Sequence, residues 1–274
     1  MRVGSICTGY GGLGQALTLA GINHTLEWVS EIDPGACKVL ETRLPDAPNI
    51  GDINNATPGP VELITAGFPC QDISNIGQRK GLDGERSGLW WRIKDVIGYL
   101  RPGHVILENV AAIAYRGGPA VIGSLTELGY DSRWTTLQAC DVGSPHERNR
   151  WFCVARDTQS VGRDVSSVAG PGEHRKSERP FRGPDRYSGG RTAWGKYASA
   201  MGRWETIVGR PPPAPSEDGR YVNPKALEWM MGLPQGWVTE VDIPKSAQIR
   251  CLGNGVVPQQ AAQAIRNLTG GNTK

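Results

Sequence analysis

The sequence predicts an α/β protein with a mostly parallel sheet, helices on both of its faces and a smaller irregular module. Apolar, strand-like runs alternate with segments of helical periodicity over the first 156 residues. A glycine-rich turn joins the first such run to the first helix, and a stretch rich in Gly, Ser, Pro and Arg follows Asp157. The 274 residues can bury a substantial core, and 37 glycines with 38% hydrophobic and 21% charged residues are typical of a soluble, loop-rich protein.

The elements of the first part follow one another along the chain. We expect strands at 2–7, 24–30, 61–66 and 104–107, and helices at 13–20, 35–43, 89–100 and 119–129, with Ser87 capping the third of these helices. The runs 130–140 and 150–155, joined by a short loop, predict an antiparallel pair at the end of the sheet.

The second part is less regular. From Asp157 to about Arg220 the sequence shows little sustained periodicity, so we expect an irregular module there. Asn223 and Pro224 predict a capped helix start, followed by a core face formed by Leu227, Met230 and Met231. The loop LGNGVVP, residues 252–258, and a helix over 259–268 complete the chain.

Charge is unevenly distributed along the chain. The formal net charge is +3, but residues 163–210 carry ten Lys and Arg against five Asp and Glu, which is +5 and leaves −2 for the rest. A basic insert on a near-neutral body favours a polyanionic partner such as nucleic acid, although an ordinary solvated loop region fits the charge equally well.

Several classes of protein and site are disfavoured. No apolar run approaches the roughly 18 residues of a membrane span, and the start leads into a strand without the features of a secretory signal. We therefore expect a cytoplasmic protein with no membrane association. The six cysteines lie far apart without zinc-ligand spacing, so we expect no metal site and mostly small, buried thiols.

The stretch SICTGYGGLGQAL places Gly9, Gly11 and Gly14 in the G-x-G-x-x-G pattern of a nucleotide-binding turn. Glu31, at the end of the second predicted strand, can bind ribose hydroxyls. A nicotinamide cofactor and S-adenosylmethionine fit this pattern equally well.

The stretch GFPCQDIS, residues 67–74, follows the strand VELITA and should lie at the carboxyl edge of the sheet, where ligands bind. Gly67 allows close backbone approach, Pro69 stiffens the turn, and Cys70 is thereby held at the cleft. A thiolate is strongly nucleophilic, and hydride transfer needs no such group. This turn favours the second cofactor.

Two further stretches place charged groups near this edge. In HVILENVAAI, Glu108 and Asn109 directly follow a strand, and a carboxyl group in a partly dry cleft has a raised pKa and can donate a proton. In PHERNRWFCVA, Arg148 and Arg150 are expected to share one face of a strand, as suits a phosphate or carbonyl ligand. A strand-end cap and a surface ion pair are the ordinary alternatives.

Together these stretches resemble the ordered motifs of the cytosine-C5 DNA methyltransferase family. The resemblance spans residues 5–258 and includes the glycine turn 9–14, Glu31, Gly51-Asp52-Ile53, GFPCQDIS, RKGLDGERSGL, ENV, HERNR and LGNGVVP. It implies a Rossmann-like, class I methyltransferase fold, with a catalytic domain formed by 1–156 plus 246–274 and a target recognition domain at 157–245.

The resemblance also implies the chemistry. Cys70 adds to C6 of a cytosine flipped out of the duplex, Glu108 hydrogen-bonds or protonates N3, and Arg150 holds O2. Arg148 helps to position the site, and Asn109 and Gln71 organise its neighbourhood.

The implied cofactor is S-adenosyl-L-methionine, converted to S-adenosyl-L-homocysteine, with no metal. Its expected contacts come from four stretches, which are Thr8, Gly9, Tyr10, Gly11, Gly12 and Leu13; Glu31, Ile32, Asp52 and Ile53; Gly67 and Pro69; and Asn254, Gly255 and Val256. Cys7, Ile32 and Gly255 replace residues common in the family, so we expect reduced cofactor affinity, and His146 replaces a common glutamine.

The expected partner is double-stranded DNA, with a cognate restriction endonuclease as a further candidate, and we expect a monomer. Three alternatives stay open. They are an RNA cytosine-C5 methyltransferase of the same fold, a catalytically silent DNA-binding protein, and an oxidoreductase that would leave the Pro-Cys-Gln turn unexplained.

Overall fold

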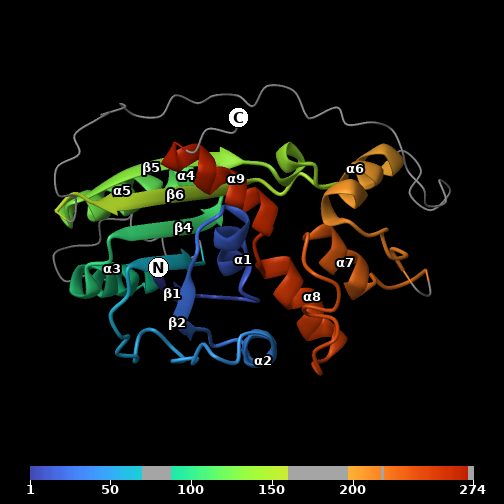
Figure 1. The fold of residues 1–274 in the computed structure, drawn as a ribbon, viewed down its shortest axis with the longest axis horizontal. Helices are drawn as coiled ribbons and strands as arrows, with labels where there is room; N and C mark the ends of the chain where they lie inside the picture. Colours follow the sequence, from blue (N-terminus) through green and yellow to red (C-terminus); the bar gives the residue numbers. More distant parts are fainter. Residues whose placement is uncertain (70–87, 160–196, 217–218, 271–274) are drawn as a thin grey trace.

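A computed structural model describes residues 1–69, 88–159, 197–216 and 219–270 (Figure 1). Within these ranges six strands form one sheet in the order β2-β1-β3-β4-β6-β5. The first four strands in that order are parallel, whereas β6 runs antiparallel to both β4 and β5. Their bounds are β1 Arg2–Ile6, β2 Thr25–Ser30, β3 Leu63–Gly67, β4 His104–Val110, β5 Tyr130–Leu137 and β6 Arg150–Asp157.

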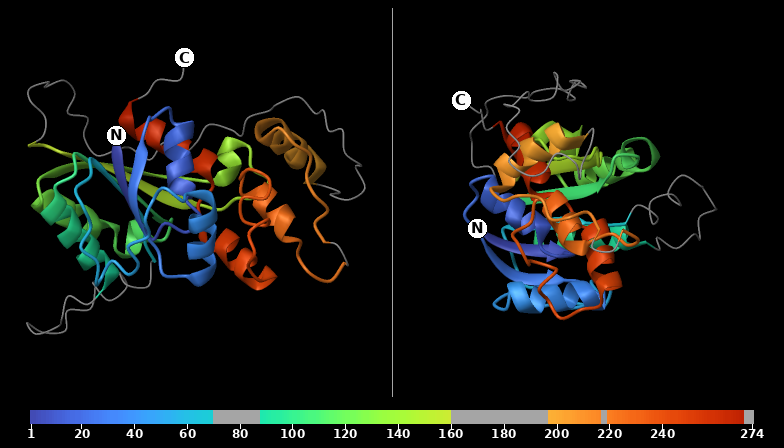
Figure 2. Two further views of the ribbon diagram at one scale, coloured as in Figure 1. Left: turned by 60° about the horizontal axis from the view of Figure 1, so that its bottom comes forward. Right: turned by 90° about the vertical axis from the view of Figure 1, so that its right-hand side faces the viewer.

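Helices cover both faces of the sheet because the strands are apolar on both sides. In β4, Val105 and Leu107 pack with α3 (Leu89–Leu100) and α5 (Gly118–Glu127). The alternate residue Ile106 packs on the other face with α1 (Gly12–Leu19) and α9 (Pro258–Thr269). Figure 2 shows α1 and α9 next to each other, although they come from opposite ends of the sequence.

A third hydrophobic cluster joins the later helices to the body of the protein. Met201, Trp204 and Trp229 are buried together with Tyr10 of the glycine turn and Val39 of α2 (Pro34–Arg43). Figure 1 shows these helices beyond the end of the sheet at which β4 and β5 finish. Their bounds are α6 Ala198–Val208, α7 Pro224–Met230 and α8 Lys245–Asn254.

The structure confirms most of the predicted elements and corrects others. The eleven-residue helix α6 lies where we predicted only irregular chain, because Met201 and Trp204 gain burial against α7 rather than through an extended periodic pattern. Residues 252–254 of the predicted loop LGNGVVP belong to α8, and the four-residue helix α4 (Ile113–Arg116) was not predicted.

Two helix caps were predicted, and the described residues include one of them. Asn223 caps α7 by accepting a hydrogen bond from the Lys225 amide at 3.0 Å, as predicted. Ser87, the predicted cap of α3, lies outside the described residues. Among the helices in the described ranges, none has the length and apolar character to cross a membrane.

Candidate active site

The site is assembled at the carboxyl edge of the parallel strands, where β3 ends at Gly67 and β4 ends at Val110. The antiparallel strand β6 begins at this edge, because its first residue, Arg150, pairs with Val110. Glu108 pairs with Phe152, so residues 108, 110, 150 and 152 share one face of the sheet. This register brings Glu108 and Arg150 together diagonally across two strands.

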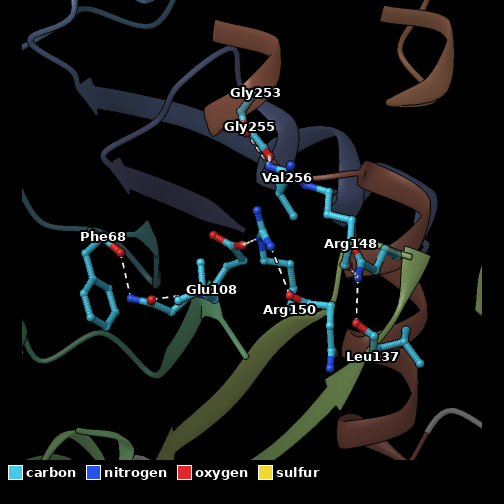
Figure 3. Close-up of polar contacts among 12 residues, drawn as sticks. Phe68, Glu108, Leu137, Arg148, Arg150, Gly253, Gly255 and Val256 are labelled. Atoms are coloured by element: carbon cyan, nitrogen blue, oxygen red, sulfur yellow. Dashed lines mark hydrogen bonds and ion pairs between the residues drawn. The ribbon is translucent and has the colours of Figure 1, made fainter. Parts of the chain in front are cut away.

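Glu108 and Arg150 form an ion pair with 3.0 Å between Oε1 and Nε (Figure 3). Glu108 is only 9% exposed. Burial raises the pKa of this carboxyl to about 7, against the opposing effects of the Arg150 and Arg148 guanidinium groups. Its second oxygen, Oε2, faces Gly67, where an added Cβ would lie 3.3 Å away. Glu108 can therefore carry a proton near neutral pH at the carboxyl edge of the sheet.

Glu108 and Asn109 lie within β4 rather than after a strand, which corrects the prediction. The predicted strand ended at Leu107, but pairing with Phe152 and Trp151 of β6 extends it to Val110. Asn109 is buried, and its Nδ2 donates to the Phe68 carbonyl at 2.7 Å. This bond ties β4 to the segment that leads into exposed Pro69. Cys70 and Gln71, predicted here, lie outside the described residues.

Arg148 and Arg150 contact different parts of the protein, which corrects the prediction of a shared face. Arg148 precedes β6 and has a left-handed backbone with φ 27°, so the alternation of a strand does not apply to it. Its Nη2 donates to the carbonyls of Gly253, at 2.8 Å, and Gly255 (Figure 3). Arg148 therefore binds the C-terminal end of α8 and the loop that follows it, whereas Arg150 binds Glu108.

The glycine turn connects β1 to α1 with left-handed backbones at Gly9, φ 58°, and Gly11, φ 85°. Added Cβ atoms would meet nothing within 4 Å at Gly9, so this position borders open space. Thr8 closes the turn, with its hydroxyl donating to the Ser5 carbonyl at 2.9 Å. Leu13 points into the core beneath the turn.

Glu31 follows β2 and holds the neighbouring backbone. Its Oε2 accepts from the Gly9 amide at 2.8 Å, and its Oε1 accepts from the amides of Ile32 and Asp33 at 2.9 Å each. Oε2 accepts only one of these three bonds and so keeps acceptor capacity for a ligand. Ile32 beside it is 70% exposed, which is unusual for an aliphatic side chain and offers an apolar surface next to the acceptor.

Asp52 and Ile53 lie in a tight turn after Gly51, whose carbonyl accepts from the Ser30 hydroxyl at the end of β2 at 2.6 Å. Asp52 Oδ1 accepts from the Asn54 amide at 2.9 Å, and the Ile53 side chain is buried. The Ile53 carbonyl accepts from Arg92 of α3 at 2.8 Å, which fixes the turn against this helix. Gly51 has φ 74° and open space around an added Cβ.

Three residues that shape the site were not predicted from the sequence. Gln260 of α9 is fully buried and donates from Nε2 to the carbonyls of Leu137, at 2.7 Å, and Arg148, at 2.8 Å (Figure 3). Trp237 donates from its indole to the Tyr10 carbonyl at 2.8 Å. Arg43 donates to the Trp237 carbonyl at 3.0 Å. For Gln260, a Gln two positions after the Pro of a helix start was the sole sequence signal, and it is a weak one.

The described cysteines other than Cys7 have raised thiol pKa values because of burial. The pKa of Cys251, for example, is raised to about 11. In the part of the chain that the structure describes, no group of three or more His, Cys, Asp or Glu side chains is placed to hold a metal ion.

Comparison with known proteins identifies the family of this chain. A family model described as C-5 cytosine-specific DNA methylase matches residues 1–186. The Type II methyltransferase M2.BsuMI of Bacillus subtilis is 32% identical over 301 aligned residues, which cover 98% of this chain and 75% of that protein. This chain belongs to the C-5 cytosine-specific DNA methylase family.

Other members of the C-5 cytosine methylase family match over shorter stretches. The Type II methyltransferase M.CviJI of Paramecium bursaria Chlorella virus IL3A is 34% identical over 148 residues, or 50% of this chain. The aligned part spans only 40% of that viral protein. Among solved structures, a DNMT2 variant from Spodoptera frugiperda covers 97% of this chain with a TM-score of 0.69 at 16% identity, which confirms the predicted α/β methyltransferase fold.

The residues at this edge fit the S-adenosylmethionine that the family implies. A Cβ added at Gly9 or Gly51 would meet nothing within 4 Å, so a ligand can approach the main chain closely at both positions. Glu31 Oε2 supplies an acceptor suited to a ribose hydroxyl, and exposed Ile32 supplies an apolar surface suited to a flat purine ring.

Proposed function

We propose that this protein transfers a methyl group from S-adenosylmethionine to C5 of cytosine in double-stranded DNA. The observation that carries the proposal is the buried Glu108 with a pKa near 7, paired with Arg150 at the carboxyl edge of the sheet. Burying a carboxyl group is costly, and a purely binding role gives no reason for that cost. A buried carboxyl group with a raised pKa is typical of a catalytic acid.

Glu108 acts as a general acid in this proposal. It donates its proton to N3 of the cytosine, which withdraws electrons from the ring and makes C6 electrophilic. Arg150 lies 3.0 Å from Glu108 and binds the neighbouring O2 through its remaining N–H groups. Glu108 and Arg150 then bind neighbouring atoms, N3 and O2, on the same edge of the pyrimidine.

Cys70 acts as the nucleophile in its thiolate form. Its sulfur bonds to C6, and the C5–C6 electron pair becomes available at C5. When bound, S-adenosylmethionine would supply an electrophilic methyl group on a sulfonium and leave as S-adenosyl-L-homocysteine. Once C5 carries the methyl group, a base removes the C5 proton, and the freed electron pair re-forms the C5–C6 double bond. The S–C6 bond breaks with its electron pair on sulfur, and N3 returns its proton to Glu108. The ring and the thiolate are restored.

The target cytosine must leave the duplex, because C6 is inaccessible in stacked DNA and extrusion costs a few kcal/mol. We assign recognition of the flanking bases to residues 157–245. Arg182, Arg186 and Arg191 are candidates within it and lie outside the described residues. The relatives named as Type II methyltransferases make a cognate restriction endonuclease part of this proposal.

The test is expression in a host that lacks cytosine methylation, followed by bisulfite sequencing of the host DNA. We expect 5-methylcytosine at one short motif. Folded protein that leaves the DNA unmodified would support the catalytically silent alternative, and modification of RNA alone would support the RNA methyltransferase.

Cys70→Ala should abolish methylation while the protein still folds and binds DNA, whereas the matched change Cys140→Ala should leave methylation intact. A duplex carrying 5-fluorocytosine should become covalently attached to Cys70 in the presence of S-adenosylmethionine, because fluorine at C5 blocks the final elimination. Activity in the Cys70→Ala protein would contradict the mechanism.

A further inference from the structure

Tyr10 occupies an unusual place in the glycine turn. It is 1% exposed, although the residues on both sides of it, Gly9 and Gly11, have the left-handed backbones of a tight loop. Its hydroxyl donates to the Val256 carbonyl at 2.6 Å, across 246 positions of sequence. Burial raises the pKa of this phenol, so the hydroxyl stays a donor. The first and last segments of the predicted cofactor site are thus joined by one side chain.

The Tyr10 ring is held between two glycines. A Cβ added to Gly255 would lie 1.9 Å from ring atom Cε1 and 2.3 Å from Cζ. A Cβ added to Gly12 would lie 2.9 Å from Cε2 on the other side. Gly255 has an extended backbone, φ −73° and ψ 175°, which any residue adopts. Glycine is therefore required at position 255 by the Tyr10 ring rather than by the backbone.

The same loop is fixed from a second direction. Arg148 donates to the carbonyls of Gly253 and Gly255, and Tyr10 donates to the next carbonyl, that of Val256. Trp237 in turn fixes the main chain of Tyr10 itself. Three successive anchor points leave the loop little freedom to move relative to the glycine turn.

We propose that Tyr10 and Gly255 act as an interlocked pair that positions the 254–256 loop for S-adenosylmethionine. The ring and hydroxyl of Tyr10 supply the packing and the hydrogen bond that a side chain at position 255 would otherwise supply. Tyr10 is a positioning residue here and takes no part in the chemistry. This inference rests on the proposed function, because it takes residues 254–256 as cofactor contacts. It also replaces our expectation that glycine at position 255 weakens cofactor binding by removing contacts.

The test is a double-mutant cycle with two readouts, the dissociation constant for S-adenosylmethionine by calorimetry and the melting temperature without cofactor. Gly255→Ala should weaken binding about tenfold or more and lower the melting temperature, because the methyl group overlaps the ring. Tyr10→Leu removes two of the three overlapping ring atoms, Cε1 and Cζ, together with the hydrogen bond, and replaces the third, Cδ1, by a methyl group that can rotate away. This change should also weaken binding.

In the double variant the new methyl group occupies the space that the ring vacated. The loss of affinity in the double variant should therefore be at least fivefold smaller than the product of the losses in the two single variants. Tyr10→Phe keeps the ring and removes only the hydrogen bond to the Val256 carbonyl, so it should bind S-adenosylmethionine severalfold more weakly. This variant tests the proposal even if Gly255→Ala does not fold. Gly123→Ala in α5, where an added Cβ meets nothing within 4 Å, and Tyr99→Leu at an exposed position are the matched controls.

Failure of this inference is distinguishable from failure of the proposed function. Wild-type protein that does not bind S-adenosylmethionine would overturn the proposed function, while the melting temperatures still test the interlock. Wild-type protein that binds the cofactor, with losses in the two single variants that multiply without coupling, would overturn the interlock alone.

Discussion

The Glu108–Arg150 pair and the Tyr10–Gly255 interlock lie at the same edge of the sheet but are built in different ways. The pair is placed by the register of two adjacent strands, and its interaction is between opposite charges. The interlock joins residues far apart in sequence through ring packing and a carbonyl hydrogen bond. On the proposed function, this contrast predicts that the pair governs the rate of reaction, whereas the interlock governs cofactor affinity and stability.

The largest effect is expected at Glu108. Glu108→Gln keeps the shape and an N–H donor but removes the transferable proton, so kcat should fall by about 10²–10⁴ with little change in cofactor affinity. Single-turnover methylation assays would measure the rate and calorimetry the affinity. Glu127→Gln, an exposed carboxyl on α5, is the control. An equal loss of cofactor affinity would break the contrast between the two regions.

The pH dependence of kcat/KM tests the role of Glu108 as a general acid. Since the pKa of Glu108 is near 7, the proton is present below this pH and lost above it, so kcat/KM should fall about tenfold per pH unit on the alkaline side. This alkaline fall should disappear in Glu108→Gln. A wild-type profile that stays flat from pH 6 to 9 would argue against general acid catalysis by this group.

A smaller effect, on stability rather than rate, is expected at Glu228. This buried carboxylate accepts from the amides of Gly236, Val238 and Thr239 at 2.7–2.9 Å and so holds the turn that carries Trp237. Glu228→Gln replaces one acceptor oxygen by a donor and should lower the free energy of unfolding by roughly 2–4 kcal/mol.

Urea unfolding would measure this loss, and Glu240→Gln, exposed in the same turn, should change stability by less than about 0.5 kcal/mol. The rate constant at saturating cofactor should stay within a few fold of wild type. A large fall in that rate without a loss of stability would show that the turn contributes to the reaction directly.

The smallest effect is expected at His146, whose ring contacts the Ser144 hydroxyl at 2.6 Å. Burial, together with nearby Arg148, lowers the pKa of this imidazole to about 4. The unfolded chain then binds more protons than the folded protein, so stability is lost as the pH falls from about 6.5 to 4. His146→Gln should remove on the order of 1–2 kcal/mol of this loss, measured as the difference between unfolding at pH 7.5 and pH 5. An unchanged difference would show that His146 does not titrate there.

The sequence predicts one of these regions better than the other, for a physical reason. Strand periodicity and the strand-end position of ENV placed Glu108 at the edge, because period-two alternation is local information. Even so, the predicted strand ended at Leu107, three residues before the end of β4, because these last residues are held extended by pairing with β6.

The interlock could not be predicted in this way. The overlap at Gly255 depends on where a ring 245 positions earlier lies, and the anchor at Arg148 depends on a left-handed backbone that broke the expected alternation. The helix α6 was missed for the same reason, since its Trp204 is buried by a neighbouring helix rather than by a regular apolar stripe.

The reversed direction of β6 separates the Glu108–Arg150 pair from the start of the segment that follows the strand. The strand starts beside Glu108 and ends at Asp157, which pairs with Tyr130 and hydrogen-bonds to Gly103 at the opposite edge. Eight residues of strand span about 25 Å. The chain therefore leaves the sheet far from the ion pair, whereas α6 and α7, later in the same segment, pack at the carboxyl edge with Tyr10. Changes made directly after Asp157 should thus leave the ion pair intact, whereas changes in these two helices act next to it.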